Sequence, residues 1–500
     1  MRNYLIFALM GCALSLPAQH LRIIHTNDTH SQIDPTEAPE NLGGVMRRMA
    51  IIDSIRSSKG PEVMVVDAGD AVQGSLFFTL FGGEVEQKLM NAIGYDIQIL
   101  GNHEFDNGME RLAENYREAT PILLSTNYNL SSTPLRGLFN PWAVREVDGR
   151  KVGFIAINTN PDGLIDASNW TGLVYLDPFD AANATAWYLK NIEGVDRVVA
   201  ITHIGYDDPE DVNDIELARK TKNIDLIIGG HSHTRVEPGS AGSRVVNAAG
   251  DTVAIVQTGS KGRWLGEADI DLATGRVTER LHRIDSRLDG YTNPAIAAVI
   301  EPYRHAVDSV SSIVIGRSSR KFAQDSPALL NLLSDYVREK GAEICGTPVD
   351  LAIMNKGGIR NSIQKGKVTK GTIMNMLPFD NRIVVLDLKG SDLLDNLGVM
   401  ARLQKGNGVS DGVSVTFAPD GSIVSASLNG HAIDAEKTYR VATISYLARG
   451  GDHMTPLTRG KLVASSDKII FEDLIDSFEH GSLHRRTLKG DDTVRMAPAK

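Results

Sequence analysis

The first half of the chain alternates short apolar runs with stretches that repeat apolar residues at helical spacing. Six runs that are bounded by polar or glycine-rich positions are typical of buried strands: 21–27, 62–70, 96–103, 151–158, 197–203 and 225–231. Amphipathic stretches that predict helices lie between several of them: 45–58, 108–119, 181–192 and 212–222. Strands that alternate with helices predict a layered α/β domain.

The pattern changes after about residue 275. A helix is predicted over 291–312, beginning after Asn293 and Pro294, and another over 328–340. Further strands are predicted at 349–355, 382–388, 412–417 and 439–445. We therefore expect two domains and a linker, divided as follows: residues 20–290, a linker helix over 291–312, and a smaller α+β domain over 313–500.

Residues 1–19 have the pattern of a signal peptide. Arg2 precedes an apolar run over 4–16, which is too short to span a bilayer and is followed by small and polar residues. The pattern predicts an exported protein, periplasmic or associated with the cell envelope. Residues 9–12 also resemble a bacterial lipobox, which would keep Cys12 as a lipid anchor; the alternative is an incidental cysteine. No later run reaches 18 apolar residues, so no transmembrane segment is expected.

Composition excludes several classes. The 500 residues include 52 Lys and Arg against 62 Asp and Glu, a formal net charge of −10. This acidic balance argues against a nucleic-acid partner held through its phosphates. With 2 cysteines, the chain is neither a disulfide scaffold nor a thiolate zinc cluster.

Polar clusters end the predicted strands of the first half. In order they are Asp28-Thr29-His30, Asp67-Ala68-Gly69-Asp70, Gly101-Asn102-His103-Glu104-Phe105-Asp106, Thr202-His203 and Gly230-His231-Ser232-His233. Sites in α/β sheets lie at the carboxyl ends of strands, so these clusters are expected to converge. Imidazole and carboxylate suit first-row divalent ions such as Zn, Mn or Co.

Two ions require a ligand that reaches both, and Asp70 is the natural choice. A bridging carboxylate holds such ions roughly 3.5–4 Å apart, close enough to clamp a phosphoryl group. The other expected ligands are Asp28 and His30 for one ion, Asn102 and His203 for the second, and His231 and His233 divided between them.

His103 directly follows a proposed ligand and is expected to face the cleft. Asp106, three residues later, can accept a hydrogen bond from its ring and orient it. A protonated histidine stabilised in this way can bind the transferring phosphoryl group or protonate the departing alkoxide.

These residues resemble the calcineurin-like metallophosphatases. The segments HTNDTH, DAGD, GNHEFD and GGHSHT together resemble the secreted 5′-nucleotidase family, which includes bacterial UDP-sugar hydrolases and 2′,3′-cyclic-nucleotide phosphodiesterases. The resemblance implies a four-layered α/β/β/α domain, a helical linker and a C-terminal substrate-binding domain. It also implies the same seven metal ligands and a catalytic pair of His103 and Asp106.

The second domain carries the candidate substrate residues. Arg360 ends a glycine-containing loop, 355–360, and offers a planar fork to phosphate or carboxylate; the alternative is a turn with a surface arginine. The loop resembles the family's Asn-Gly-Gly-Gly-Ile-Arg segment, with Lys356 replacing one glycine. Arg317 and Lys321 resemble a basic pair that faces substrate phosphate in some members; the alternative is a solvated charge cluster.

Two aromatic residues resemble the family's base clamp. A base stacked on an aromatic ring gains about 1–3 kcal/mol in nucleic-acid cases. Phe379 and Tyr446 would supply the two faces, with Asn381 near the edge of the base and Asp452 placed for ribose hydroxyls. The alternatives are core packing for Phe379 and an ordinary strand end for Tyr446. Both faces together favour a nucleotide over a simple phosphomonoester.

The sequence thus predicts an exported, dimetal-dependent 5′-nucleotidase that releases nucleoside and phosphate through in-line attack by metal hydroxide. The enzymatic alternative is a UDP-sugar hydrolase, or a 2′,3′-cyclic-nucleotide phosphodiesterase and 3′-nucleotidase. A nucleotide-binding or scavenging protein with residual catalysis is an alternative of another class.

Overall fold

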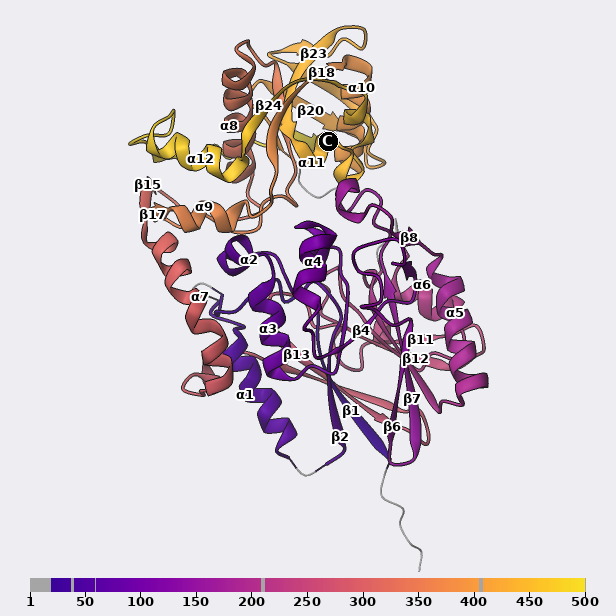
Figure 1. Cartoon of the computed structure of the whole chain (residues 1–500). Coiled ribbons are helices and arrows are strands. Elements are labelled where there is room, and N and C mark those ends of the chain that lie inside the picture. The colour runs from indigo at the N-terminus through magenta and orange to yellow at the C-terminus, as the bar shows by residue number, and fades with distance from the viewer. Residues whose placement is uncertain (1–18, 37–39, 59, 208–211, 404–407, 500) are drawn as a thin grey trace, which may run out of the picture.

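The computed structural model describes residues 19–36, 40–58, 60–207, 212–403 and 408–499. Cys12 and the predicted signal peptide up to residue 18 lie outside this range. The chain forms two domains, and helix α7 (Pro294–Ser312) runs along one side between them (Figure 1). Asn293 caps this helix by accepting the backbone N–H groups of Ala295 and Ile296. No described helix is both long and apolar enough to cross a membrane.

The first domain contains two six-stranded sheets. The first sheet runs β14 (Val277–Arg283), β13 (Trp264–Asp271), β1 (His20–Thr26), β2 (Glu62–Asp67), β3 (Ile97–Ile99), β4 (Ile122–Leu124). The second runs β11 (Arg244–Val246), β12 (Thr252–Val256), β10 (Leu226–Ile228), β9 (Arg197–His203), β7 (Arg150–Asn158), β6 (Trp142–Val147). A separate pair joins β5 (Tyr128–Asn129) to β8 (Val174–Tyr175).

Apolar residues on both faces of the sheets explain the layers. Successive strand residues point to opposite faces, so Ile23 packs between the sheets whereas Ile24 packs toward the helices. The covering helices are α1 (Val45–Arg56), α2 (Leu76–Phe81), α3 (Glu84–Ile93) and α4 (Gly108–Tyr116) on the first sheet's side, and α5 (Pro178–Tyr188) and α6 (Asp214–Lys220) on the second. The predicted four-layered α/β/β/α class is confirmed.

The second domain is smaller and mixed. Its largest sheet runs β19 (Gly408–Val409), β16 (Leu351–Met354), β23 (Thr438–Ile444), β18 (Arg382–Lys389), β24 (Lys461–Ile469). Two smaller sheets run β17 (Gly366–Thr369), β15 (Val314–Ser318), β25 (Thr487–Leu488), and β22 (His431–Ala432), β21 (Ile423–Leu428), β20 (Val413–Phe417), β26 (Met496–Pro498). The helices are α8 (Pro327–Cys345), α9 (Lys370–Met376), α10 (Gly390–Arg402), α11 (Ser445–Ala448) and α12 (Ile470–Glu479).

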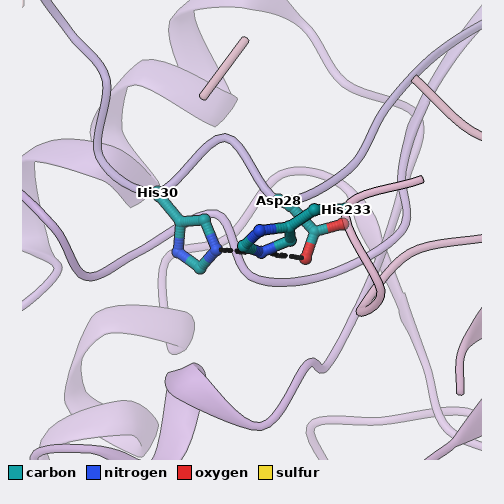
Figure 2. A group of neighbouring side chains, drawn as sticks. All are labelled: Asp28, His30 and His233. Atoms are coloured by element: carbon teal, nitrogen blue, oxygen red, sulfur yellow. Dashed lines mark hydrogen bonds and ion pairs between the residues drawn. The ribbon is translucent and has the colours of Figure 1, made fainter. Parts of the chain in front are cut away.

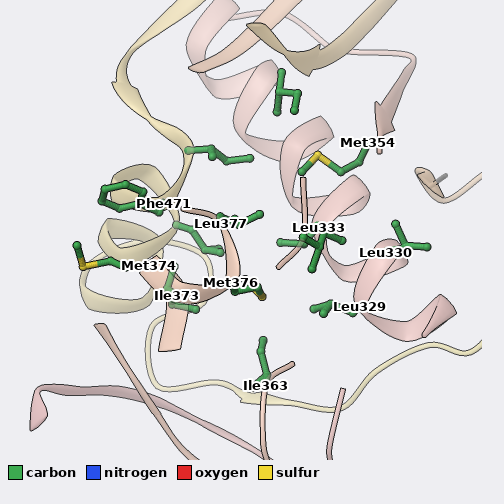
Figure 3. Packing of buried hydrophobic residues seen from close by; sticks show 14 of the residues in the cluster. Leu329, Leu330, Leu333, Met354, Ile363, Ile373, Met374, Met376, Leu377 and Phe471 are labelled. Carbon is green, nitrogen blue, oxygen red and sulfur yellow. The ribbon is translucent and has the colours of Figure 1, made fainter. Parts of the chain in front are cut away.

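One apolar core holds the second domain's helices to its sheet. Leu329 and Leu333 of α8 gather with Met354 at the end of β16, and Met376 of α9 joins them (Figure 3). All four side chains are buried. This core fixes α9 and the turn after it, which carries Phe379.

Candidate metal centre and substrate cavity

The seven predicted metal ligands converge at one edge of the first domain. We call Asp28, His30, Asp70, Asn102, His203, His231 and His233 the strand-end cluster. Each follows or ends one of five strands: β1, β2 and β3 of the first sheet, and β9 and β10 of the second. Because neighbouring strands in each set are parallel, their carboxyl ends meet at one edge. The two packed sheets bring both edges together.

One half of the cluster contains Asp28, His30 and His233 (Figure 2). The Nε2 atoms of the two histidines lie 2.9 Å apart. Asp28 Oδ1 lies 3.4 Å from His233 Nε2 and 4.0 Å from His30 Nε2. Three potential ligand atoms from distant parts of the chain therefore face one another.

The other half contains Asp70, Asn102, His203 and His231. Asp70 Oδ2 lies 3.2 Å from His203 Nε2, and also 3.9 Å from His30 Nε2 in the first half. Asn102 Oδ1 lies 2.9 Å from His231 Nδ1. Asp70 thus lies between the halves, as does Asp28, whose carboxylate also groups with Asp70 and His203.

The donor set fits divalent ions. Asp28, His30 and Asp70 are at most 2% exposed, and the buried Nε2 of His203 has no hydrogen-bond partner of good geometry among the described residues. The Nδ1 of His203 lies 2.7 Å from the carbonyl oxygen of Ala68, which leaves Nε2 free to ligate. Mixed imidazole, carboxylate and amide donors suit Zn, Mn or Co. The residues present are therefore able to hold metal.

The backbone of the cluster is strained. Five proposed ligands have left-handed φ angles although none is glycine: Asp28 (48°), His30 (47°), Asp70 (53°), His231 (80°) and His233 (56°). Such φ values are uncommon for non-glycine residues and gather at functional sites. Gly101 permits close approach, because a Cβ there would lie 2.2 Å from Asp70 Oδ1.

Glu104 is a buried residue that the sequence analysis did not assign. Its Oε2 accepts the backbone N–H of Gly101 at 2.6 Å and that of Asp70 at 3.1 Å. Its Oε1 accepts the N–H of Ala71 at 2.9 Å. One carboxylate therefore joins the loops after β2 and β3, which carry Asp70 and Asn102. Its position inside GNHEFD was the available signal, but its partners are backbone groups that no motif reveals.

His103 and Asp106 form a hydrogen-bonded pair beside the cluster. His103 Nδ1 lies 2.9 Å from Asp106 Oδ2, and the backbone N–H of His103 donates to Asp70 Oδ1 at 2.9 Å. Burial lowers the pKa of His103, but the carboxylates of Asp106 and Asp70 outweigh it and raise the pKa above its ordinary value. Burial raises the pKa of Asp106 against the opposing effect of His103. The pair can hold a proton facing the cavity.

Arg360 and Phe379 reach the strand-end cluster from the second domain. Arg360 Nη2 lies 3.5 Å from His30 Nε2, and its guanidinium lies 5.8 Å from the centre of the Phe379 ring. The rings of Phe379 and His103 are 5.8 Å apart, at 33°. An anion at the strand-end cluster would therefore also meet Arg360.

Tyr446 and Asp452 contact each other in the second domain. The hydroxyl of Tyr446 lies 3.1 Å from Asp452 Oδ1, and Asn355 Nδ2 donates to Asp452 Oδ2 at 2.6 Å. Asn381 Oδ1 accepts the N–H of Tyr446 at 3.0 Å, so in this structure it holds the start of α11. We call Arg360, Phe379, Asn381, Tyr446 and Asp452 the C-domain cluster.

A cavity of about 710 Å³ lies between the two domains and is lined by residues of both. Its lining includes Asn102, His103 and Asp106 from the first domain and all five members of the C-domain cluster. A cavity of this size suits a small organic ligand.

Arg317 and Lys321 lie elsewhere among the described residues. Both are exposed, Arg317 on β15 and Lys321 just beyond it. Lys321 lines a separate polar cavity of about 660 Å³, between the domains and α7. Neither lines the cavity that contains Arg360 and Phe379.

Comparison with known proteins agrees with this geometry. Residues 21–235 match the calcineurin-like phosphoesterase family model, and residues 307–459 match the model of the 5′-nucleotidase C-terminal domain. These matches identify the chain as a metal-dependent phosphoesterase.

Individual relatives agree. The chain is 30% identical to human 5′-nucleotidase over 75% of this chain and 71% of that protein. It is also 30% identical to the Bacillus subtilis trifunctional nucleotide phosphoesterase protein YfkN, over 88% of this chain but only 32% of that longer protein. The crystal structure of a 5′-nucleotidase precursor from Thermus thermophilus superposes with a TM-score of 0.85 at 28% identity, covering 96% of this chain and 99% of that one. This chain belongs to the 5′-nucleotidase family.

Proposed function

We propose that the protein is an exported, dimetal-dependent 5′-nucleotidase that hydrolyses nucleoside 5′-monophosphates to nucleoside and phosphate. One observation carries this proposal: a single cavity is lined by Asn102 of the strand-end cluster, by the His103–Asp106 pair beside that cluster, and by all five residues of the C-domain cluster. The strand-end cluster supplies groups for metal and phosphate, and the C-domain cluster supplies aromatic and polar groups for a nucleoside. The family relatives named as 5′-nucleotidases support the same reaction.

The proposed metal site uses all seven strand-end residues. Asp28, His30 and His233 would hold one ion, and Asn102, His203 and His231 the other, with Asp70 between them. Two divalent ions, when bound, supply positive charge for the phosphate oxygens and lower the pKa of a water molecule. Zn, Mn and Co all suit this donor set.

The chain's own residues orient the substrate and move a proton. Arg360 offers its planar fork to the phosphate, while Phe379 and Tyr446 bind the base and Asp452 binds the ribose hydroxyls. Asp106 holds Nδ1 of His103, so that Nε2 can hydrogen-bond the phosphoryl group and protonate the departing 5′ oxygen. Asn381 keeps Tyr446 in place. Arg317 and Lys321 would reach the phosphate only in another arrangement of the domains.

Phosphate release from AMP tests the function. Mature protein is stripped of metal and then given Mn²⁺, Co²⁺ or Zn²⁺. We expect phosphate release that depends on added metal. No release from AMP while the ions are demonstrably bound would contradict the proposal.

A phosphodiesterase or UDP-sugar hydrolase is the second candidate. Phe78, Phe81 and Arg111 also line the cavity, and its volume of about 710 Å³ could hold a substrate larger than a mononucleotide. Hydrolysis of bis(p-nitrophenyl) phosphate at a rate comparable with that of AMP would favour the phosphodiesterase or UDP-sugar hydrolase activity.

Export and domain boundaries belong to the same proposal. We place a signal peptide at residues 1–19, the metallophosphatase domain at 20–290, the linker at 291–312 and the nucleotide-binding domain at 313–500. The mass of the protein recovered from the periplasm or cell envelope would locate the processed N-terminus. Limited proteolysis would report the domain boundaries.

A further inference from the structure

A loop of the first domain touches the C-domain cluster directly. Gly163 accepts the backbone N–H of Asp452 at 3.0 Å. The hydroxyl oxygen of Tyr446 lies 3.4 Å and 3.3 Å from the carbonyl oxygens of Gly163 and Leu164. The guanidinium of Arg449 pairs with Asp166 Oδ2. The two residues proposed to bind base and ribose thus lie against residues 163–166 of the other domain.

The same loop also touches the catalytic pair. Asn169 Nδ2 donates to the backbone carbonyl of Asp106 at 3.0 Å. Asp106 in turn holds His103 through its side chain. The segment 163–169 therefore has one end on the C-domain cluster and the other on the residue that orients His103.

Asp166 joins these two ends. Its Oδ2 faces Arg449, while its Oδ1 accepts the backbone N–H of Ser168 at 3.0 Å and the Ser168 hydroxyl at 2.7 Å. The second set of bonds caps the short 3₁₀ helix over Ala167–Trp170, which contains Asn169. The Asp166 side chain is only 14% exposed. A movement of Arg449 can therefore shift Asn169, because the Asp166 carboxylate contacts Arg449 and also caps the helical turn that contains Asn169.

We propose that loop 163–169 couples nucleoside binding to the position of the His103–Asp106 pair, and so makes hydrolysis of nucleotides faster than hydrolysis of phosphate esters without a base. The inference rests on the proposed function. A nucleoside that orders Tyr446 and Asp452 favours the contacts that these residues make with the loop. Binding energy from the remote end of the substrate is then used at the reacting end.

Two matched substrates test this coupling. Ribose 5-phosphate has the same 5′ ester as AMP but no base. The variant Asp166→Asn keeps the shape and the cap to Ser168, and places an amide group in front of Arg449. In the metal-loaded protein we expect kcat/KM for AMP to fall about tenfold, the effect of losing a charge-assisted hydrogen bond. The value for ribose 5-phosphate should stay within about twofold.

Three further variants complete the test. Asp162→Asn removes an exposed carboxylate just before the loop and should leave both substrates unchanged. Arg449→Gln should reproduce the loss for AMP, and the double variant with Asp166→Asn should be no worse than either single variant. Asn169→Ala, at the other end of the loop, should also lower kcat/KM for AMP while leaving kcat/KM for ribose 5-phosphate nearly unchanged.

The coupling would be overturned if kcat/KM fell equally for AMP and ribose 5-phosphate, or if the ratio of the two values stayed that of the unmodified protein. Additive effects in the double variant would also overturn it. Failure of the proposed function looks different: the unmodified, metal-loaded protein would then release no phosphate from AMP. That result would remove the basis of both proposals before any variant is measured.

Discussion

The strand-end cluster meets the substrate cavity at Asn102, and the C-domain cluster lines the same cavity with all five residues, but the two clusters are held in place differently. Parallel strands, left-handed backbone and backbone hydrogen bonds fix the strand-end residues inside one domain. Side-chain hydrogen bonds on turns hold the C-domain residues, and several of those bonds reach the other domain. Apart from Arg360, the groups proposed to act on the phosphate are thus fixed by the sheets of one domain, whereas the groups proposed to select the rest of the substrate depend on contacts between the domains.

The largest effect is expected from Asp70→Asn, which should lower hydrolysis of AMP and ribose 5-phosphate alike. Loss of its charge between the two halves of the strand-end cluster should remove both ions, costing several kcal/mol or at least about 10³-fold in rate. Metal content measured by plasma mass spectrometry, beside both rates, checks this. Asp67→Asn is the matched control, because this carboxylate of the same strand bonds Thr26 instead of the histidines and its variant should retain metal. A mutant of Asp70 that keeps two ions would contradict its position between them.

His103→Ala should be nearly as severe while leaving the metal in place. Removal of a general acid costs about 10²–10⁴-fold in turnover. The ring contributes no proposed ligand atom, so metal content should equal that of the unmodified protein. The control variant His282→Ala, at a half-buried histidine of β14 whose ring pairs with Glu267, should change neither quantity. Equal loss of metal and turnover in His103→Ala would contradict a role at the substrate.

The strand-end cluster was predictable because its information is local. Each ligand follows its own strand within a few residues, and parallel strands bring their carboxyl ends together, so short motifs were enough to place seven side chains. The alternation of apolar runs with helices predicted a layered α/β domain, whereas the four layers were implied by the resemblance to the metallophosphatases. No long-range contact had to be known in advance.

Contacts between distant residues were not predictable in this way. Asp166 and Arg449 are 283 positions apart, and nothing in the sequence around either residue pairs it with the other. Asn381 lines the cavity, but the hydrogen bond that its amide oxygen accepts from the N–H of Tyr446 joins residues 65 positions apart and was not predicted. Lys321 lies only 39 positions before Arg360 in the sequence but lines a different cavity. Such placements depend on tertiary packing that no single segment encodes.

Glu104→Gln should weaken metal binding without abolishing it. The amide group of glutamine cannot accept the N–H that one carboxylate oxygen accepts, so the loops that carry Asp70 and Asn102 lose part of their connection. Changes of this kind beside metal ligands cost about 10–100-fold in metal affinity. Titration against a chelator of known affinity measures it.

Glu86→Gln is the matched control for Glu104. Glu86 is an equally buried glutamate, but its carboxylate accepts from the Ser31 hydroxyl instead of the backbone of the two loops. Its variant should keep the metal affinity of the unmodified protein. Equal weakening in both variants would mean that general loss of buried charge, and not the connection between the loops, is responsible.

Tyr446→Phe should have the smallest effect and the most selective one. Phenylalanine keeps the ring that would stack on a base but removes the hydroxyl that lies against Asp452 and loop 163–169. A neutral hydrogen bond contributes about 0.5–1.5 kcal/mol, so kcat/KM for AMP should fall about two- to tenfold. If the hydroxyl acts only when a bound base orders Tyr446, kcat/KM for ribose 5-phosphate should barely change. An equal loss for ribose 5-phosphate and for AMP would instead make the hydroxyl part of ribose binding, because the two substrates share the sugar.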